Sequence, residues 1–121
     1  MNHIRIYTDQ DGESHFEEIE TEFKMEIYAP PAPEFGISEP TSAARYVMVR
    51  FPPNWDSELH PSPRRQLFIM LSGMLQSRTS GGKVIDLEPG DVALMEDTTG
   101  KGHTAKAMNG KEVRAIMVHL D

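Results

Sequence analysis

Cysteine is absent from the sequence of 121 residues. Disulfide bonds, zinc sites built on thiolates, iron–sulfur clusters and a cysteine nucleophile are therefore excluded. Any metal ion would have to be held by histidine, carboxylate or amide side chains, which limits a metal site to those residue types.

Basic residues are scarce. Lysine and arginine number 12 against 19 aspartate and glutamate residues, which gives a formal net charge of −7 at pH 7. Proteins bind nucleic acids and anionic lipids with a surplus of lysine and arginine that neutralises phosphates. We therefore expect neither a nucleic acid nor a membrane as a partner.

Long hydrophobic runs are also missing. The first 20 residues are polar and lack the apolar core of a secretory signal, and no apolar run approaches the roughly 18 residues of a membrane span. The length is typical of one domain, and a chain of this size can bury a core although only 38% of its residues are hydrophobic. The sequence thus favours one soluble domain in the cytoplasm.

Helical patterns are rare because nine prolines and nine glycines interrupt the chain. Runs rich in β-branched and aromatic residues, or alternating in polarity, instead predict short strands between turn signals. Glycine pairs and the dipeptide Asn-Gly supply the positive φ angles that hairpin turns need. We predict strands at residues 3–7, 22–28, 45–51, 66–71, 74–79, 83–87, 92–95, 103–108 and 112–120.

Short strands with turn signals every 8–12 residues are typical of an antiparallel sandwich or barrel. The segment 29–40 is rich in proline, which a central strand does not accommodate, and is therefore predicted to be a rigid crossover. We expect one domain, in which residues 1–40 form N-terminal strands and this crossover, packed on a barrel of residues 41–121. The acidic residues at 17–22 are expected to form a solvated face.

Two of the five histidines, His60 and His103, stand at the start of predicted strands or just before them. Imidazole is the commonest metal ligand in proteins and titrates near neutral pH. Loops at the rim of a barrel commonly shape a binding site, so both are candidate functional residues, although either alone also suits a surface position. Trp55, in the loop before His60, is expected to cover a sheet edge rather than the mouth of the barrel.

The residues around the two histidines resemble the two short motifs of the cupin family. The first motif has two histidines separated by one residue, followed by a glutamate and then a glycine. The corresponding positions here hold His60, Ser62, Gln66 and Gly73. The second motif begins with Pro-Gly-Asp, as residues 89–91 do, and ends at a third histidine, here His103. The stretch before His103 is longer than in the family and lacks its proline. The resemblance extends over residues 45–120.

This resemblance implies an all-β fold, the cupin-type jelly-roll barrel or double-stranded β-helix. It also implies a metal site at His60, Gln66 and His103 for one divalent ion such as iron, manganese, nickel or zinc. The family further suggests a homodimer in which exposed sheet edges are paired. Cupins include dioxygenases, isomerases, other enzymes, binding proteins and storage proteins, so the resemblance alone leaves the reaction open.

Two of the family's ligands are changed in this chain. The hydroxyl of Ser62 is a poor ligand for a divalent ion, and Gln66 offers a carbonyl oxygen without charge. An ion held by His60, His103 and Gln66 would have no anionic protein ligand to offset its positive charge. It would therefore be weakly held and would favour an anionic ligand. Arg64, expected on the same side of an extended segment, would strengthen this preference by a bidentate contact with a carboxylate or phosphate.

We therefore expect the barrel to bind a small, anionic organic metabolite, with five ligand-contacting residues: Ser62, Arg64, Tyr46, Phe68 and Met70. The last three alternate along two strands, a pattern that core residues show more often. With a metal ion as Lewis acid or oxygen-binding centre, the protein would be an enzyme of the dioxygenase or isomerase type. Without one, it would be a non-catalytic binding module or a structural dimeric barrel, although a histidine could still act as general acid or base.

Overall fold

The computed structural model describes the whole chain, residues 1–121, and contains strands, turns and loops without a helix. It accordingly has no helix with the length and apolar character needed to cross a membrane. The strands are β1 (Asn2–Thr8), β2 (Ser14–Glu20), β3 (Lys24–Glu26), β4 (Phe35–Ile37), β5 (Arg45–Phe51), β6 (Gln66–Ser72), β7 (Leu75–Thr79), β8 (Val84–Leu87), β9 (Val92–Met95), β10 (His103–Ala107) and β11 (Val113–His119).

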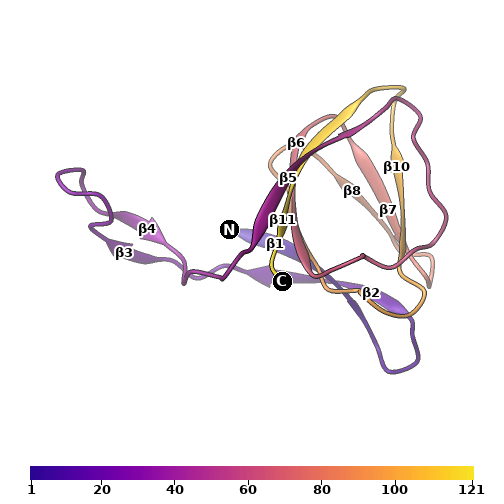
Figure 1. Cartoon of the computed structure of the whole chain (residues 1–121), viewed down its shortest axis with the longest axis horizontal. Coiled ribbons are helices and arrows are strands. Elements are labelled where there is room, and N and C mark those ends of the chain that lie inside the picture. The colour runs from indigo at the N-terminus through magenta and orange to yellow at the C-terminus, as the bar shows by residue number, and fades with distance from the viewer.

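Two sheets form a barrel (Figure 1). The larger sheet has six strands in the order β2-β1-β9-β6-β11-β5, and the smaller has three in the order β10-β7-β8. Neighbouring strands are antiparallel except for β1 and β9, which are parallel. The predicted all-β fold is confirmed, and each strand predicted after residue 44 is present with nearly the expected bounds.

The core lies between the two sheets and follows from the alternation of side chains along each strand. On β6 the inward residues Gln66, Phe68 and Met70 are buried, while the residues between them are only half-buried. The same period places Val113 and Ala115 of β11 inside the barrel. The buried hydrophobic residues are Ile6, Phe68, Met70, Leu75, Leu87, Ala93, Met95, Ala105, Ala107, Val113 and Ala115.

The first 20 residues are part of the barrel wall rather than a layer packed on it. β1 lies inside the larger sheet, between β2 and β9, and β2 forms one edge of that sheet. β2 is an additional strand that the sequence did not predict, because its glutamates give it the composition of a solvated face. Charged side chains on an edge strand hinder pairing with other chains, which explains this composition.

Residues 21–40 form an arm that projects away from the barrel (Figure 1). β3 and β4 pair only with each other, with Lys24 opposite Ile37 and Glu26 opposite Phe35. The expected crossover at 29–40 is thus corrected: most of its prolines lie in the connection between these two strands, and β4 follows them. Proline is compatible with this position because the hairpin has no central strand.

Candidate functional site

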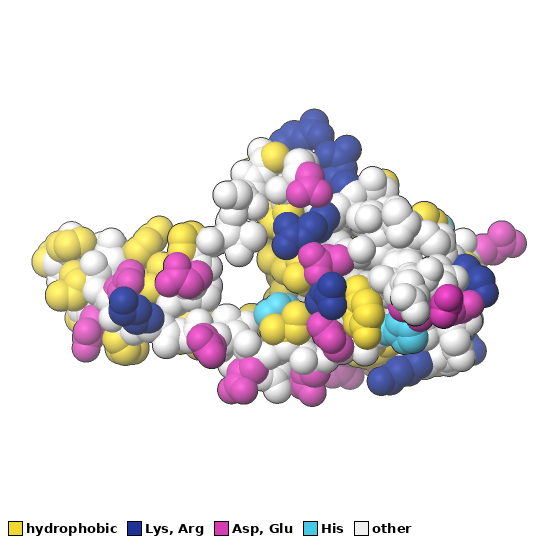
Figure 2. Space-filling model, turned by 90° about the horizontal axis from the view of Figure 1, so that it is seen from below, with side chains coloured by type: hydrophobic (Ala, Val, Ile, Leu, Met, Phe, Trp, Pro, Cys, Tyr) yellow, Lys and Arg dark blue, Asp and Glu magenta, His cyan; other side chains and the backbone are white.

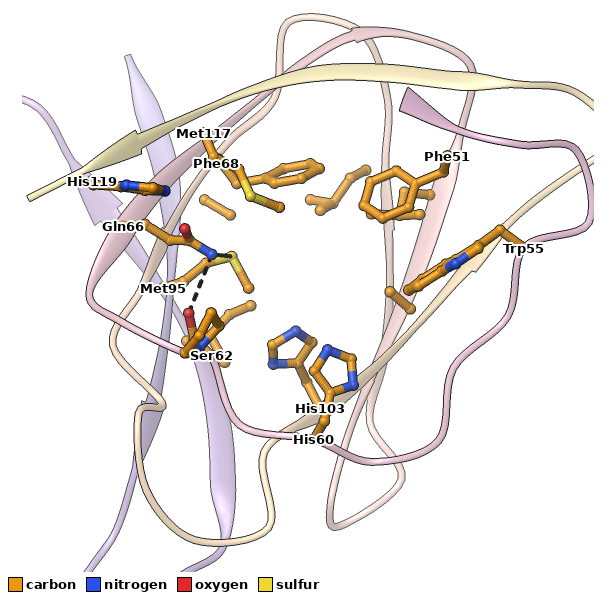
Figure 3. Close-up of a pocket in the computed structure, with 16 residues that line it drawn as sticks. Phe51, Trp55, His60, Ser62, Gln66, Phe68, Met95, His103, Met117 and His119 are labelled. Atoms are coloured by element: carbon orange, nitrogen blue, oxygen red, sulfur yellow. Dashed lines mark hydrogen bonds between the residues drawn. The ribbon is translucent and has the colours of Figure 1, made fainter. Parts of the chain in front are cut away.

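A cavity of about 210 Å³ lies between the two sheets (Figure 3). Ten of its 16 lining residues are hydrophobic, and no carboxylate, lysine or arginine is among them. The polar residues of the wall are His60, Ser62, Gln66, His103 and His119. The cavity therefore combines a mostly apolar lining with a few hydrogen-bonding groups, three of which are imidazoles.

His60 and His103 converge at this cavity although they are far apart in the sequence. They form an antiparallel bridge in which the backbone N–H of each donates to the carbonyl of the other at 3.0 Å. Their ring centroids lie 4.9 Å apart, and both rings project into the cavity (Figure 3). Gly102, with a φ of 73°, permits this approach, because a Cβ there would lie 2.0 Å from the carbonyl oxygen of His60.

Hydrogen bonds fix the protonation of Nδ1 in both rings. Nδ1 of His60 lies 2.9 Å from the carbonyl oxygen of Glu58, and because a carbonyl only accepts, this nitrogen carries a proton. Nδ1 of His103 lies 2.5 Å from Oδ2 of Asp97, whose side chain is fully buried. A carboxylate that accepts from one ring nitrogen fixes both the orientation and the tautomer of the imidazole. Nε2 of each ring is thus left for a ligand.

Ser62 and Gln66 are buried side chains that bind each other. The hydroxyl of Ser62 donates to the carbonyl oxygen of Arg64 at 2.6 Å and accepts from Nε2 of Gln66 at 3.3 Å. The Gln66 amide nitrogen also lies 3.9 Å from the sulfur of Met95 (Figure 3). These contacts hold the wall in place and leave Oε1 of Gln66 as an acceptor toward a ligand.

His119 is a third imidazole of the wall and was not among the predicted site residues. It ends β11 and lies opposite Gln66 of β6, and its buried Nδ1 has no hydrogen-bond partner. Desolvation lowers the pKa of His119 below its usual 6.5, and the charges of Arg64 and Arg45 lower it further, so the ring is neutral at pH 7. A buried, unpaired nitrogen beside a cavity is a position where the polar group of a ligand would be held.

Aromatic side chains form much of the apolar wall (Figure 3). The rings of Phe51 and Trp55 have centroids 4.7 Å apart, and the Phe51 ring lies 6.3 Å from that of Phe68. The backbone carbonyl of Trp55 accepts from the N–H of Ala107 at 2.8 Å, which attaches its loop to the end of β10. Trp55 therefore lines the cavity, contrary to the expectation that it covers a sheet edge.

The structure brings together His60, Ser62, Gln66, Phe68 and His103, but three other predicted site residues are not in the cavity wall. Tyr46 lies on the far side of the larger sheet and is 67% exposed. Met70 points inward as expected, yet it is packed in the hydrophobic core. Arg64 follows a bend at Pro63, because the prolines interrupt the extended backbone on which the expected alternation depended.

The donor set at the cavity does not fit a resident divalent ion. Catalytic metal sites generally have at least three protein ligands, and nowhere in the chain do three histidine, aspartate or glutamate side chains form such a group. The predicted set of His60, Gln66 and His103 supplies two imidazoles and a neutral amide, without a charged ligand. Asp97, the nearby carboxylate, is already engaged by Nδ1 of His103. The metal site stays a prediction that these donors do not favour.

Two residues of the candidate site that sequence reasoning missed, Asp97 and His119, continue the period-two pattern of β9 and β11. Asp97 continues the inward series of Ala93 and Met95 beyond the end of β9. His119 continues the series of Ala115 and Met117 on β11, which lie inside or against the core. Extending the alternation to the strand ends would have indicated both residues.

Solved structures share this fold. A Cupin 2 conserved barrel domain protein from Salinispora arenicola has a TM-score of 0.52 and 14% identity, over 82% of this chain and 74% of that one. A predicted oxalate decarboxylase from Thermotoga maritima has a TM-score of 0.50 and 16% identity, over 84% and 95%. A conserved protein of unknown function from Streptococcus pyogenes has a TM-score of 0.50 and 14% identity. The match covers 63% of this chain and 62% of the Streptococcus pyogenes protein. At these identities the likeness shows the fold alone.

A comparison with curated protein sequences found no significant match. The cupin domain family, by contrast, matches residues 47–119, which is more than half of the chain. The matched region runs from β5 to β11 and contains His60 and His103. The chain therefore belongs to the cupin family, as its two motifs predicted.

Proposed function

We propose that this cupin binds a small organic acid with an apolar body, such as a monocyclic aromatic carboxylate, in the cavity between its sheets. One observation carries the proposal: a mostly apolar wall is joined by three imidazoles, each with a nitrogen left for a ligand. Small-molecule sites commonly combine an apolar lining with a few oriented polar groups.

The volume of the cavity sets the size of the ligand. An engineered apolar cavity of about 150 Å³ is known to hold benzene. A cavity of about 210 Å³ thus has room for one ring together with a carboxylate or a group of similar size. An open volume of this size supports binding over a structural barrel with a filled interior.

The charges around the cavity favour an anion. No carboxylate lines the wall, and the carboxylate of Asp97 lies behind the ring of His103. Arg64 and Arg45 are outside the wall, but their charges reach His119 and contribute to its lowered pKa. A cationic ligand would meet these positive charges without a carboxylate to offset its own.

His103 is the residue we expect to hold the acid group. Its Nε2 can accept the proton of an acid or, once the ring is protonated, donate to the carboxylate. The charge of the imidazolium is then offset by Asp97, which already binds the opposite nitrogen. This binding mode needs no metal ion, and the ability to take up a ligand's proton is also what general-base catalysis requires.

Titration with three one-ring compounds of different charge tests this proposal. Trp55 is the only tryptophan and lines the cavity, so its fluorescence is expected to change when a ligand binds. We expect benzoate to saturate the change and to bind at least about tenfold more tightly than neutral benzamide, the difference that one charge-assisted hydrogen bond supplies. The cation benzylamine is expected not to saturate it.

Two results would contradict this expectation. Equal affinities for the three compounds would show that the imidazoles do not recognise the acid, and that the cavity acts only as an apolar hole. The absence of a saturable change with any of them, at concentrations where each is soluble, would remove the case for a one-ring ligand.

A further inference from the structure

The polar groups of the cavity wall include two pairs that lie in different parts of the barrel. His103 begins β10 of the smaller sheet, and its backbone bridge places the ring of His60 beside it. Gln66 and His119 lie on β6 and β11 of the larger sheet, opposite each other in the register of these strands. We call Gln66 and His119 the second polar pair. Because the cavity lies between the sheets, a ligand whose acid group is held at His103 extends from there toward the second polar pair (Figure 3).

The second polar pair offers hydrogen-bonding atoms that the protein itself does not use. The amide nitrogen of Gln66 is engaged by the hydroxyl of Ser62 at 3.3 Å, whereas no protein group bonds to its Oε1. Only 3% of Gln66 is exposed, so bulk water has little access to this oxygen. Nδ1 of His119 is buried as well and has no partner. Buried polar atoms are nearly always paired in proteins, so two unpaired atoms on neighbouring strands of a cavity wall indicate a group that a ligand supplies.

We propose that the ligand of the cavity is a hydroxylated acid, in which a hydroxyl group on the ring, away from the carboxylate, is bound by Gln66 and His119. This inference rests on the proposed binding of a one-ring acid and names the second functional group of that acid. The hydroxyl donates its proton to Oε1 of Gln66. It accepts from Nδ1 of His119, in the tautomer that carries the proton there.

Other polar groups fit the second polar pair less well. A second carboxylate only accepts hydrogen bonds, so it would leave Oε1 of Gln66 unpaired and would bury a charge beside neutral side chains. An ammonium group would be repelled by Arg64 and Arg45, whose charges already contribute to the lowered pKa of His119. A methyl group would leave both polar atoms buried and unpaired. A hydroxyl satisfies both atoms without adding a charge.

Both polar pairs belong to the barrel. No residue of the arm lines the cavity, and Figure 2 shows the arm standing apart from the barrel. Recognition of the hydroxyl is therefore expected to depend on the wall residues of the barrel alone. Ligands that differ in one group, and variants that change one wall residue, can then test it directly.

Compounds that differ only in a hydroxyl or a methyl group test the proposal by isothermal titration calorimetry at pH 7. The two groups are similar in size, and a phenolic hydroxyl stays neutral at this pH because it titrates near pH ~10. We expect meta-hydroxybenzoate or para-hydroxybenzoate to bind at least about tenfold more tightly than the methylbenzoate substituted at the same position, since the methyl compound leaves both polar atoms unpaired. In the control ligand, ortho-hydroxybenzoate, the hydroxyl lies next to the acid, so no such gain is expected over ortho-methylbenzoate.

Two variants show whether the gain comes from the second polar pair. Gln66→Leu removes the acceptor, and the hydroxyl of Ser62 keeps its bond to the carbonyl of Arg64, so no buried donor is left unpaired. His119→Leu removes a nitrogen that has no partner in the protein. Each variant, once circular dichroism shows it folded, is expected to reduce the hydroxyl-to-methyl affinity ratio by at least about fivefold. Gln76→Leu, the same change on β7 outside the cavity, is the matched control and should keep the wild-type ratio.

Equal affinities of the hydroxyl and methyl compounds at both the meta and para positions would overturn the proposal. A gain that persists in both Gln66→Leu and His119→Leu would overturn it as well. Failure here is distinct from failure of the proposed function. Benzoate that binds more tightly than benzamide, without a further gain from a hydroxyl, would contradict this inference alone. A hydroxyl gain with equal binding of benzoate and benzamide would contradict only the proposed recognition of the acid.

Discussion

Replacing His103 with alanine is expected to weaken the binding of benzoate by about 10- to 100-fold, the loss of one charge-assisted hydrogen bond in a site shielded from water. The ring of His103 is buried and held by Asp97, so its Nε2 is fixed in orientation toward the cavity. His60→Ala is expected to have a smaller effect, because this ring is less buried and is attached only to the carbonyl of Glu58. The fluorescence of Trp55 measures both affinities.

The control for these variants is His15→Ala. His15 lies outside the cavity and pairs with Asp9, so its removal should leave benzoate affinity unchanged. His103→Ala also leaves the buried carboxylate of Asp97 without its partner, which is expected to cost about 3–5 kcal/mol of stability. Circular dichroism at the titration temperature therefore has to show that the variant is folded. A folded His103→Ala variant with wild-type affinity would show that this ring does not hold the acid.

Asp97→Asn tests the role of the hydrogen bond that orients the His103 ring, while the ring itself stays in place. The amide can donate to Nδ1 of His103 and thereby favour the other tautomer, with the proton on Nε2. Loss of the Asp97 charge also removes the partner of an imidazolium. We expect a fall in benzoate affinity of about tenfold with the ring still in place.

Gly102→Ala is expected to lower the free energy of unfolding by about 3–5 kcal/mol, an exceptional value for the addition of one methyl group. A Cβ at this position would collide with the backbone of His60, where no flexible side chain can give way. Relief of the collision would have to break the paired backbone hydrogen bonds between His60 and His103. Urea denaturation followed by the fluorescence of Trp55 measures the effect.

Gly110→Ala is the control, because it measures the cost of the backbone conformation without a collision. Gly110 has a φ of 63°, close to the 73° of Gly102, but a Cβ there would meet no atom within 4 Å. The control should therefore lose only the roughly 1–2 kcal/mol of a left-handed alanine. Equal losses in the two variants would show that Gly102 is needed for its φ angle alone, and that the approach of the two histidines does not depend on it.

The barrel strands could be predicted because their signals are local. β6 alternates buried and half-buried residues, and glycine or proline turns lie on either side of β7, β8 and β9. The arm could not be predicted in the same way. Whether β3 and β4 pack on the barrel or project from it depends on long-range contacts, and the prolines of 29–40 suit a turn as well as a crossover.

For the site, the sequence predicted the convergence of His60, Gln66 and His103 through a resemblance, since no local pattern links residues so far apart. The placement of Arg64 was wrong because strand alternation fails at the bend that Pro63 introduces. The inward alternation of β11 would have indicated His119, but only the pairing of β11 with β6 shows that it lies beside Gln66.

The measurement that tests the account most directly is the titration of benzoate into protein freed of metal ions by a chelator and dialysis. The account predicts saturable binding, reported by Trp55, with the same affinity before and after iron, manganese, nickel or zinc is added. Binding that appears only when one of these ions is returned would contradict it, because the imidazoles of His60 and His103 would then serve the metal and not the acid.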